Sequence, residues 1–316
     1  MAFLESFSPT LPIMLMILFG VFLRKRSFFG ETTIREIKKL VVNVSLPLVL
    51  LNAFAVMAFE LRYLWIIITV FLGCVVVMFS SRYLGKLFQI PSHFFPFLMA
   101  GFEAGMMGYA IFGSVYGVEN IPKFAIMDLG QVLFVFLVLI PTLENGGDQR
   151  MDLKAVGISF LKSPVIIAIF SGILLNISGL YPMLAGFPIS NALIQTTSVL
   201  GSVTIPMVAI VLGYDLNLKL STIAKPLKTV AIRMTIWVVF GFLFNFFIIR
   251  QMLGLDTIYQ AAAWVLLVLP PPFVIPLFMT QSNESDRNYI ANTLSLSTLV
   301  SLVSVVVIRS LNLLRL

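Results

Sequence analysis

Charged residues are scarce in this 316-residue chain, and their scarcity excludes a water-soluble protein. Only 11% of the residues are Asp, Glu, Lys or Arg, against about 25% in an ordinary soluble domain. The chain has one cysteine and one histidine, so it can form neither a disulfide framework nor a zinc site built from several such ligands. A nucleotide-binding sequence of the Walker A type is also absent, which leaves ATP-driven chemistry without support.

Long apolar runs occupy the chain instead. Hydrophobic residues make up 59% of it, and the mean hydropathy is +1.02. A helix needs about 20 apolar residues to cross the hydrocarbon of a bilayer, and ten runs with few charges come close to that length. The sequence therefore predicts an all-α polytopic membrane protein, embedded in a lipid bilayer, with ten transmembrane helices. The predicted spans are 8–23, 39–57, 63–81, 94–115, 121–143, 158–178, 190–213, 229–249, 258–280 and 288–308.

The basic residues predict how the helices are oriented. Fifteen of the 21 Lys and Arg residues fall in the loops after spans one, three, five, seven and nine, and five fall on the opposite side. Because cytoplasmic loops carry the excess of Lys and Arg, we expect a multi-pass protein of the cell membrane with both termini outside the cytoplasm. The net charge of +7 is explained by these loops and does not indicate a nucleic-acid partner.

Proline and glycine recur at corresponding places in the two halves of the chain. Pro47 lies inside span two and Pro206 inside span seven, while span four contains GFEAGMMG (101–108) and span nine contains LPPPFVIP (269–276). Because each half holds five spans, the second half enters the membrane from the opposite face, as in many transporters. The sequence thus predicts a 5+5 inverted repeat with a crossover of broken helices four and nine. Its parts are a first five-helix repeat (1–143), a cytoplasmic connecting loop (144–157) and a second repeat (158–316).

The two helix breaks are the predicted substrate site. A continuous helix satisfies its own backbone, whereas an interrupted one frees amide and carbonyl groups that only protein or a wet cavity can cover. The amino ends of the half-helices carry partial positive charge and can hold a carboxylate. The substrate-binding residues predicted in the breaks are Glu103, Gly105, Met106, Met107, Gly108, Pro270, Pro271 and Pro272.

Glu103, Asp128 and Arg233 are charged residues within predicted spans, where each charge is costly. Burial favours the neutral form of a carboxyl group, so we expect Glu103 to carry a proton or to bind the substrate. Asp128, with Gln131 three residues on along the same helix face, is a second candidate for proton coupling, and a purely structural pairing is also open. Arg233 follows Lys228 by five residues, and its long side chain is expected to extend to the cytoplasmic interface.

Five segments follow one another in an order that is typical of one transporter family. They are NVSLPLVLLNAF (43–54), EAGMMG (103–108), LGSVTIPMVAIVLGYDL (200–216), LPPPFVIPLF (269–278) and LSLSTLVSLVSVVVI (294–308). Together they resemble the auxin efflux carrier family over nearly the whole chain, and the short central loop resembles its prokaryotic members. The resemblance implies ten helices, the 5+5 repeat, outward termini and export of small organic anions such as auxin or dicarboxylates. It adds Asn43 to the predicted substrate-binding residues.

The chain departs from that family at the first break. Glu103 stands where the family usually has Asn, Met106 where a second Asn is common, and Ala110 where Pro is expected. A charged carboxylate here would repel an anionic substrate, whereas a protonated one can donate a hydrogen bond to it. The departure indicates proton-linked transport or a substrate with a cationic group.

The sequence therefore predicts a secondary active transporter, an efflux carrier of small organic anions that works by alternating access around the crossover and is proton-coupled through Glu103. A sodium-coupled carrier of the bile-acid symporter type, which is related in layout, is an alternative, as is a membrane channel or sensor. No enzyme activity, cofactor or metal site is expected. The expected partners are a small-molecule substrate and the bilayer, and a homodimer is left open.

Overall fold

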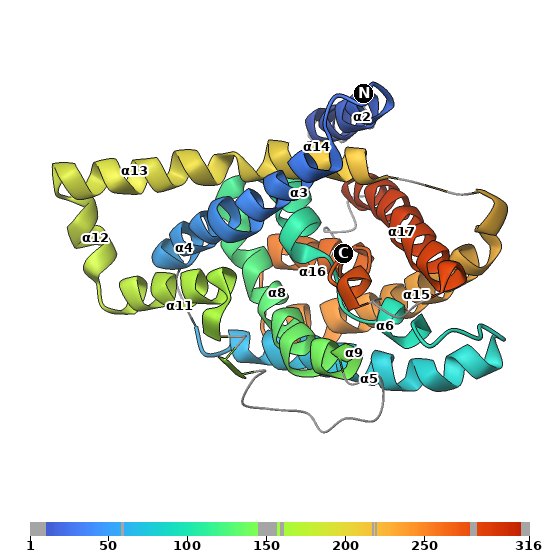
Figure 1. Ribbon diagram of the computed structural model, residues 1–316. Helices are drawn as coiled ribbons and strands as arrows, with labels where there is room; N and C mark the ends of the chain where they lie inside the picture. The colour runs from blue at the N-terminus through green and yellow to red at the C-terminus, as the bar shows by residue number, and fades with distance from the viewer. Residues whose placement is uncertain are drawn as a thin grey trace.

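All the regular structure in the described part of the chain is helical (Figure 1). The computed structural model describes residues 11–57, 60–144, 157–158, 161–216, 218, 220–278 and 283–310. The α-helices are α2 (Leu11–Lys25), α3 (Glu31–Leu40), α4 (Leu46–Val56), α5 (Tyr63–Leu87), α6 (Phe95–Met99), α7 (Tyr109–Tyr116), α8 (Ile121–Phe134), α9 (Ile140–Glu144), α11 (Pro164–Ile177), α12 (Leu180–Ala185), α13 (Pro188–Ser202), α14 (Thr204–Asp215), α15 (Ala224–Leu243), α16 (Thr257–Val268) and α17 (Glu284–Ser310). Turns of π-helix are η2 (Val41–Ser45), η3 (Ala104–Gly108), η5 (Val135–Leu139) and η7 (Phe244–Met252), and turns of 3-10 helix are η4 (Val118–Asn120), η6 (Leu220–Thr222) and η8 (Ile275–Phe278).

Among the described residues, seven helical stretches are long and apolar enough to cross a membrane, which makes this a multi-pass membrane protein. Each coincides with a predicted span, and many of their large hydrophobic side chains are exposed, as surfaces that face lipid require. The apolar helices α11 and α16 are shorter, and α2 begins at the edge of the described residues, so the count of ten stays a prediction. The seven stretches are Glu31–Val56, Tyr63–Leu87, Phe95–Tyr116, Val118–Leu143, Pro188–Asp215, Ala224–Met252 and Glu284–Ser310.

The prolines of spans two and seven lie where the helix geometry changes. Pro47 lies at the start of α4, directly after the π-helical turn η2, and Pro206 lies in the first turn of α14, which Val203 separates from α13. A proline has no amide hydrogen to donate to the carbonyl one turn earlier, so the preceding turn is loosened. Proline thus has a similar local effect in both halves of the chain.

Some pairs of helices approach so closely that their backbones touch. α2 packs along α14, where Gly20 faces the carbonyl of Ile210 and Gly213 faces that of Ile17. α4 packs along α11 in the same manner, and a Cβ on Gly172 would lie 2.7 Å from the carbonyl oxygen of Leu51. Because any larger side chain here would collide with backbone, glycine sets the distance between these helices, as is common in membranes.

Two helices are interrupted where the glycine-rich and proline-rich segments predict it. α6 ends at Met99, and the chain becomes helical again at Ala104 in η3. α16 ends at Val268, and the next helical turn begins at Ile275. Figure 1 shows α16 near the centre of the molecule, and its side chains are buried from Tyr259 onward. The second break is therefore enclosed by protein, as freed backbone groups require.

Some predictions fall on parts of the chain outside the described residues. The connecting loop 144–157 lies there except at its two ends, and so do the terminal segments 1–10 and 311–316. The domain boundaries and the side of the membrane on which the termini lie therefore stay predictions.

Candidate functional site

The two breaks contact each other directly. The amide of Glu103 donates a hydrogen bond to the carbonyl of Pro270 at 2.8 Å. Gly101 has a φ of +72°, a left-handed conformation that glycine adopts without steric cost. A Cβ on Gly101 would lie 2.9 Å from Cγ of Pro272. The backbone of the first break is thus bent onto the proline run of the second.

The carboxylate of Glu103 joins the two breaks a second time. Its Oε1 accepts a hydrogen bond from the amide of Met106 at 3.0 Å, and its Oε2 accepts one from the amide of Phe273 at 2.5 Å. Glu103 is only 9% exposed. Met106 lies in the first turn of the helix that follows one break, and Phe273 lies just before η8. Amides at helix starts carry partial positive charge, so Glu103 fills the place predicted for a bound carboxylate.

A cavity of about 530 Å³, which we call the Lys38 cavity, reaches the two residues that hold Glu103. Met106 and Phe273 form part of its lining, together with residues of α14 and α17. Its wall also contains an ion pair in which Nζ of Lys38 lies 2.6 Å from Oδ2 of Asp215. A molecule in this cavity can therefore approach both residues whose amides bind the Glu103 carboxylate.

Asp128 lies on α8 in a buried group of three polar side chains. It is 2% exposed, its Oδ2 accepts a hydrogen bond from the Tyr109 hydroxyl at 2.8 Å, and its Oδ1 accepts one from Nε2 of Gln131 at 3.2 Å. Tyr109 also lines a second cavity, of about 350 Å³, with Asn52 and Glu119. The structural pairing of Asp128 is therefore present, and its role in proton coupling stays a prediction.

Arg233 does not extend to the membrane interface, so that prediction is wrong. The side chain is 0% exposed. Its guanidinium donates hydrogen bonds to the carbonyls of Leu98, Gly101 and Leu269, which belong to both breaks. The physical reason is helix phase, because Arg233 lies on the buried face of α15 whereas Lys228 lies on an exposed face.

The other predicted residues of the first break differ in their surroundings. Gly105 and Met106 are partly exposed, and an added Cβ on Gly105 would make only ordinary contacts. Met107 is buried in the core. A Cβ on Gly108 would lie 2.6 Å from the ring of Phe124. Gly108 is therefore required by packing, and Met106 is the member of this set that lines the Lys38 cavity.

The remaining predicted residues lie on the second break and on η2. Pro270, Pro271 and Pro272 are buried, and their part in the site is the backbone contact with the first break. Asn43 is exposed, and its side-chain amide donates a hydrogen bond to the carbonyl of Lys39 at 2.9 Å. Its role in substrate binding stays a prediction.

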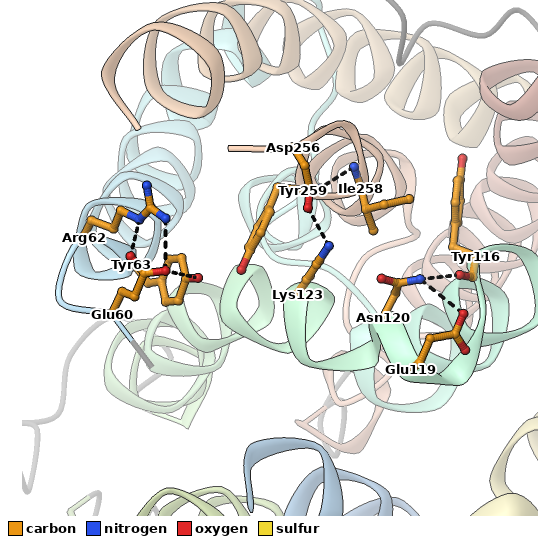
Figure 2. A network of polar contacts seen from close by, with 10 residues as sticks. All are labelled: Glu60, Arg62, Tyr63, Tyr116, Glu119, Asn120, Lys123, Asp256, Ile258 and Tyr259. Carbon is orange, nitrogen blue, oxygen red and sulfur yellow. Dashed lines mark hydrogen bonds and ion pairs between the residues drawn. The ribbon is translucent and has the colours of Figure 1, made fainter. Parts of the chain in front are cut away.

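A separate polar group, which we call the helix-start network, lies where α5, α8 and α16 begin (Figure 2). Arg62 and Glu60 form a double contact, from Nε to Oε2 at 2.6 Å and from Nη2 to Oε1 at 3.0 Å. Lys123 reaches from α8 to Asp256, with Nζ 2.6 Å from Oδ2. The other oxygen of Asp256 accepts hydrogen bonds from two amides in the first turn of α16. Asp256 is therefore the N-cap of that helix.

Both carboxylates of the helix-start network lie outside the predicted spans. The hydrogen bond from Arg62 holds the pKa of Glu60 below its ordinary value. Partial burial by itself would raise the pKa of Asp256, but the hydrogen bonds from Lys123 and from the two helix amides outweigh it and lower this pKa. Both groups are therefore charged at neutral pH. The ion pair of Asp256 with Lys123 joins the start of α16 to that of α8.

Two contributors to the breaks were not predicted. The amide of Phe273 binds Glu103, and Nε1 of Trp237 on α15 donates to the carbonyl of Met99 at 2.9 Å.

Within the described residues, no group of three or more His, Cys, Asp or Glu side chains could hold a metal ion. No protein-family model matches the chain, and no curated protein matches it either. The resemblance to the auxin efflux carrier family therefore rests on the five sequence segments alone.

Proposed function

We propose that the chain is a secondary active transporter of the cell membrane that exports small organic anions by alternating access and is coupled to protons through Glu103. The observation that carries the proposal is the pair of hydrogen bonds from Met106 and Phe273 to the Glu103 carboxylate, one from each interrupted helix. Interrupted helices whose freed backbone meets around a central site are typical of secondary transporters. In this proposal, helices four and nine cross at Glu103.

The helix contacts support the 5+5 inverted repeat. Exchanging the first five spans with the second five turns α2 into α11 and α14 into α4, and both the α2–α14 and the α4–α11 contact exist. The same exchange relates α5–α8 to α15–α17 and α5–α6 to α15–α16, which are also in contact. The shared use of glycine at the α2–α14 and α4–α11 contacts favours the same interpretation.

Protonation of Glu103 is the coupling step in this proposal. A neutral carboxyl group accepts hydrogen bonds more weakly than a carboxylate, so protonation frees the amides of Met106 and Phe273. Both residues line the Lys38 cavity, and an organic carboxylate bound there can then accept the same hydrogen bonds. A charged Glu103 would repel that anion. The proton and the anion therefore bind at the same time in this proposal.

The proposed orientation follows from the basic residues. Lys38 belongs to the basic set that predicts the cytoplasmic side, so the Lys38 cavity opens toward the cytoplasm and both termini face outward. Tyr109 lines the second cavity and donates a hydrogen bond to Asp128, and Asp128 is the second proton acceptor in this arrangement.

Counterflow uptake into proteoliposomes tests the proposal. Labelled malate, indole-3-acetate and a basic amino acid are compared at several pH values, with and without sodium. We expect uptake of an anion that rises with acidity and does not require sodium. Glu103→Gln cannot ionise, so this variant should lose the pH dependence; its melting temperature should fall, because its NH2 group faces one of the two amide donors, but the protein should stay folded at the assay temperature.

Glu60→Gln is the matched control, because it makes the same chemical change in an exposed carboxylate away from the breaks. It should keep the wild-type pH profile. An unchanged pH profile in Glu103→Gln would contradict proton coupling through this residue. Uptake that requires sodium would favour a carrier of the bile-acid symporter type, and no uptake of any substrate by folded protein would favour a channel or sensor.

A further inference from the structure

Backbone carbonyls of both interrupted helices converge on the guanidinium of Arg233. Nη1 donates to the carbonyl of Leu98 at 3.2 Å, and Nη2 donates to those of Gly101 at 2.6 Å and Leu269 at 3.1 Å. Leu98 is in the last turn of α6, Gly101 is in the first break, and Leu269 directly follows α16. The cation is 0% exposed and lies 5.1 Å from the ring centre of Phe102.

These carbonyls form a set of ligands suited to a cation. The last carbonyls of a helix have no partner within the helix and carry partial negative charge. In transporters with interrupted helices, such carbonyls and the carboxyl ends of half-helices coordinate the coupling ion. Left without a donor in a dry interior, three carbonyls would each incur a desolvation cost. Donors between the two breaks are therefore required, and the partial negative charge of these carbonyls favours a cationic donor.

We infer that Arg233 is a tethered cation that takes the place of a free coupling cation between the two breaks. The guanidinium stays charged under all ordinary conditions, so it holds this position permanently. Glu103 is the corresponding anion. It accepts hydrogen bonds from the amides of Met106 and Phe273, which lie at the amino ends of the helical segments that follow the breaks. The breaks thus hold one cation and one anion from the chain itself, and the coupling ion that remains free to exchange is the proton on Glu103.

The inference names the ion dependence of the proposed carrier, and in that sense it rests on the proposed function. The contacts of Arg233 affect the stability of the protein, however, so they can be tested by thermal melting, without a transport measurement. Trp237 provides the comparison, because its Nε1 donates to the carbonyl of Met99 at the same end of α6. It is a neutral donor to the first break, one helical turn beyond Arg233 on α15.

The experiment measures the melting temperature of purified protein in detergent. Sodium chloride, choline chloride and guanidinium chloride are compared at equal ionic strength, at a concentration that leaves the wild type folded. The wild type should melt at the same temperature in sodium and in choline. Arg233→Ala should melt about 5–10 °C lower in choline, because three charge-assisted hydrogen bonds are lost. Guanidinium should restore more than half of that loss, and Arg233→Lys should retain most of the wild-type stability.

Trp237→Phe is the matched control, and Arg62→Ala controls for the loss of an exposed arginine. Trp237→Phe should be less stable than the wild type without any recovery in guanidinium, and Arg62→Ala should melt close to the wild type. Recovery of Arg233→Ala no greater than that of Trp237→Phe would overturn the inference, as would stabilisation of the wild type by sodium over choline.

Arg233→Gln serves as a second variant if Arg233→Ala does not fold. It keeps a neutral donor but loses the charge, so it should melt below the wild type and gain stability in guanidinium. A melting temperature equal to that of the wild type, or no response to guanidinium, would overturn the inference. Counterflow is measured separately. Protein that melts as expected but carries none of the tested substrates would contradict the carrier and leave the tethered cation standing.

Discussion

The break site (98–106, 269–273 and Arg233) and the helix-start network each contain an arginine and a carboxylate, but they use them differently. In the helix-start network, Arg62 and Glu60 bind each other, with Nε 2.6 Å from Oε2. In the break site, Arg233 binds carbonyls and Glu103 binds amides, in both cases from the two breaks. The buried charges are compensated by backbone groups of both breaks, whereas the exposed carboxylate of Glu60 is compensated by the Arg62 side chain and by solvent.

Burial explains the difference between the two regions. An exposed ion pair is screened by water and salt, so it contributes little to stability. A buried charge needs several hydrogen-bond partners, because desolvation costs far more than any single bond returns. The ends of interrupted helices supply the required partial charges of both signs. Equivalent substitutions should therefore have larger effects in the break site than in the helix-start network.

The largest difference in stability between the two regions is expected when a glycine with a positive φ is replaced by alanine. Gly101 (φ +72°) lies against Pro272, whereas Gly254 (φ +59°) lies beside the helix-start network with nothing within 4 Å of an added Cβ. Alanine costs about 1–2 kcal/mol in the left-handed conformation, and overlap with Pro272 adds about 1–3 kcal/mol at Gly101. Thermal melting of purified protein should show a clearly greater loss for Gly101→Ala than for Gly254→Ala. Equal losses would mean that the breaks can move apart freely.

Removal of a tyrosine hydroxyl gives a smaller contrast. Tyr109, directly after the break site, donates to buried Asp128 at 2.8 Å, and Tyr63 donates to exposed Glu60 at 3.1 Å. A hydrogen bond to a buried charged group contributes about 1.5–3 kcal/mol, whereas Glu60 can exchange its partner for water. Tyr109→Phe should therefore lower the melting temperature clearly, and Tyr63→Phe should lower it less, although it also loses the hydrogen bond with the Tyr259 hydroxyl. Similar shifts in the two variants would indicate that water reaches Asp128.

The breaks and most spans could be predicted because their causes are local. Pro270, Pro271 and Pro272 cannot continue a helix in any fold, since each lacks an amide hydrogen. The glycines between 101 and 108 weaken a helix by a similarly local effect. Spans such as 63–81 follow from composition alone, and the structure extends that one to Tyr63–Leu87. These predictions did not require knowledge of any partner segment.

Contacts between the breaks could not be predicted, because they join residues far apart in the chain. Glu103 and Phe273 are separated by 170 residues, and the hydrogen bond uses a backbone amide, which leaves no mark in the sequence. Neither residue type at these positions identifies the other as its partner. The two helix breaks could thus be located from the sequence, but the hydrogen bonds between them could not.

Arg233 is a different case, because the sequence contained the signal that was missed. The buried face of α15 includes Val230, Arg233, Trp237 and Gly241, at the spacings of three and four that define one helix face. A step of five residues from Lys228 turns about 140° around the helix. Proximity in sequence to an exposed lysine suggested the interface, whereas helix phase indicated the interior.

The smallest effect is expected for the exposed pair of Lys123 and Asp256. Hydrogen bonds lower the pKa of Asp256 in the folded protein, so the charged form contributes stability above its unfolded pKa of about 4. That contribution is lost as the pH falls through the lower folded pKa. Asp256→Asn should therefore be less stable by under about 1 kcal/mol at neutral pH, and equal to the wild type in acid.

Melting curves of both proteins across this pH range check the prediction, with Lys123→Met as the control that removes the other charge. Asn caps helix starts as well as Asp does, so Asp256→Asn removes the charge and keeps the cap of α16. A deficit that persisted in acid would assign the effect to the geometry of the cap. The backbone hydrogen bonds that Asp256 accepts, and not its ion pair with Lys123, would then be its contribution to stability.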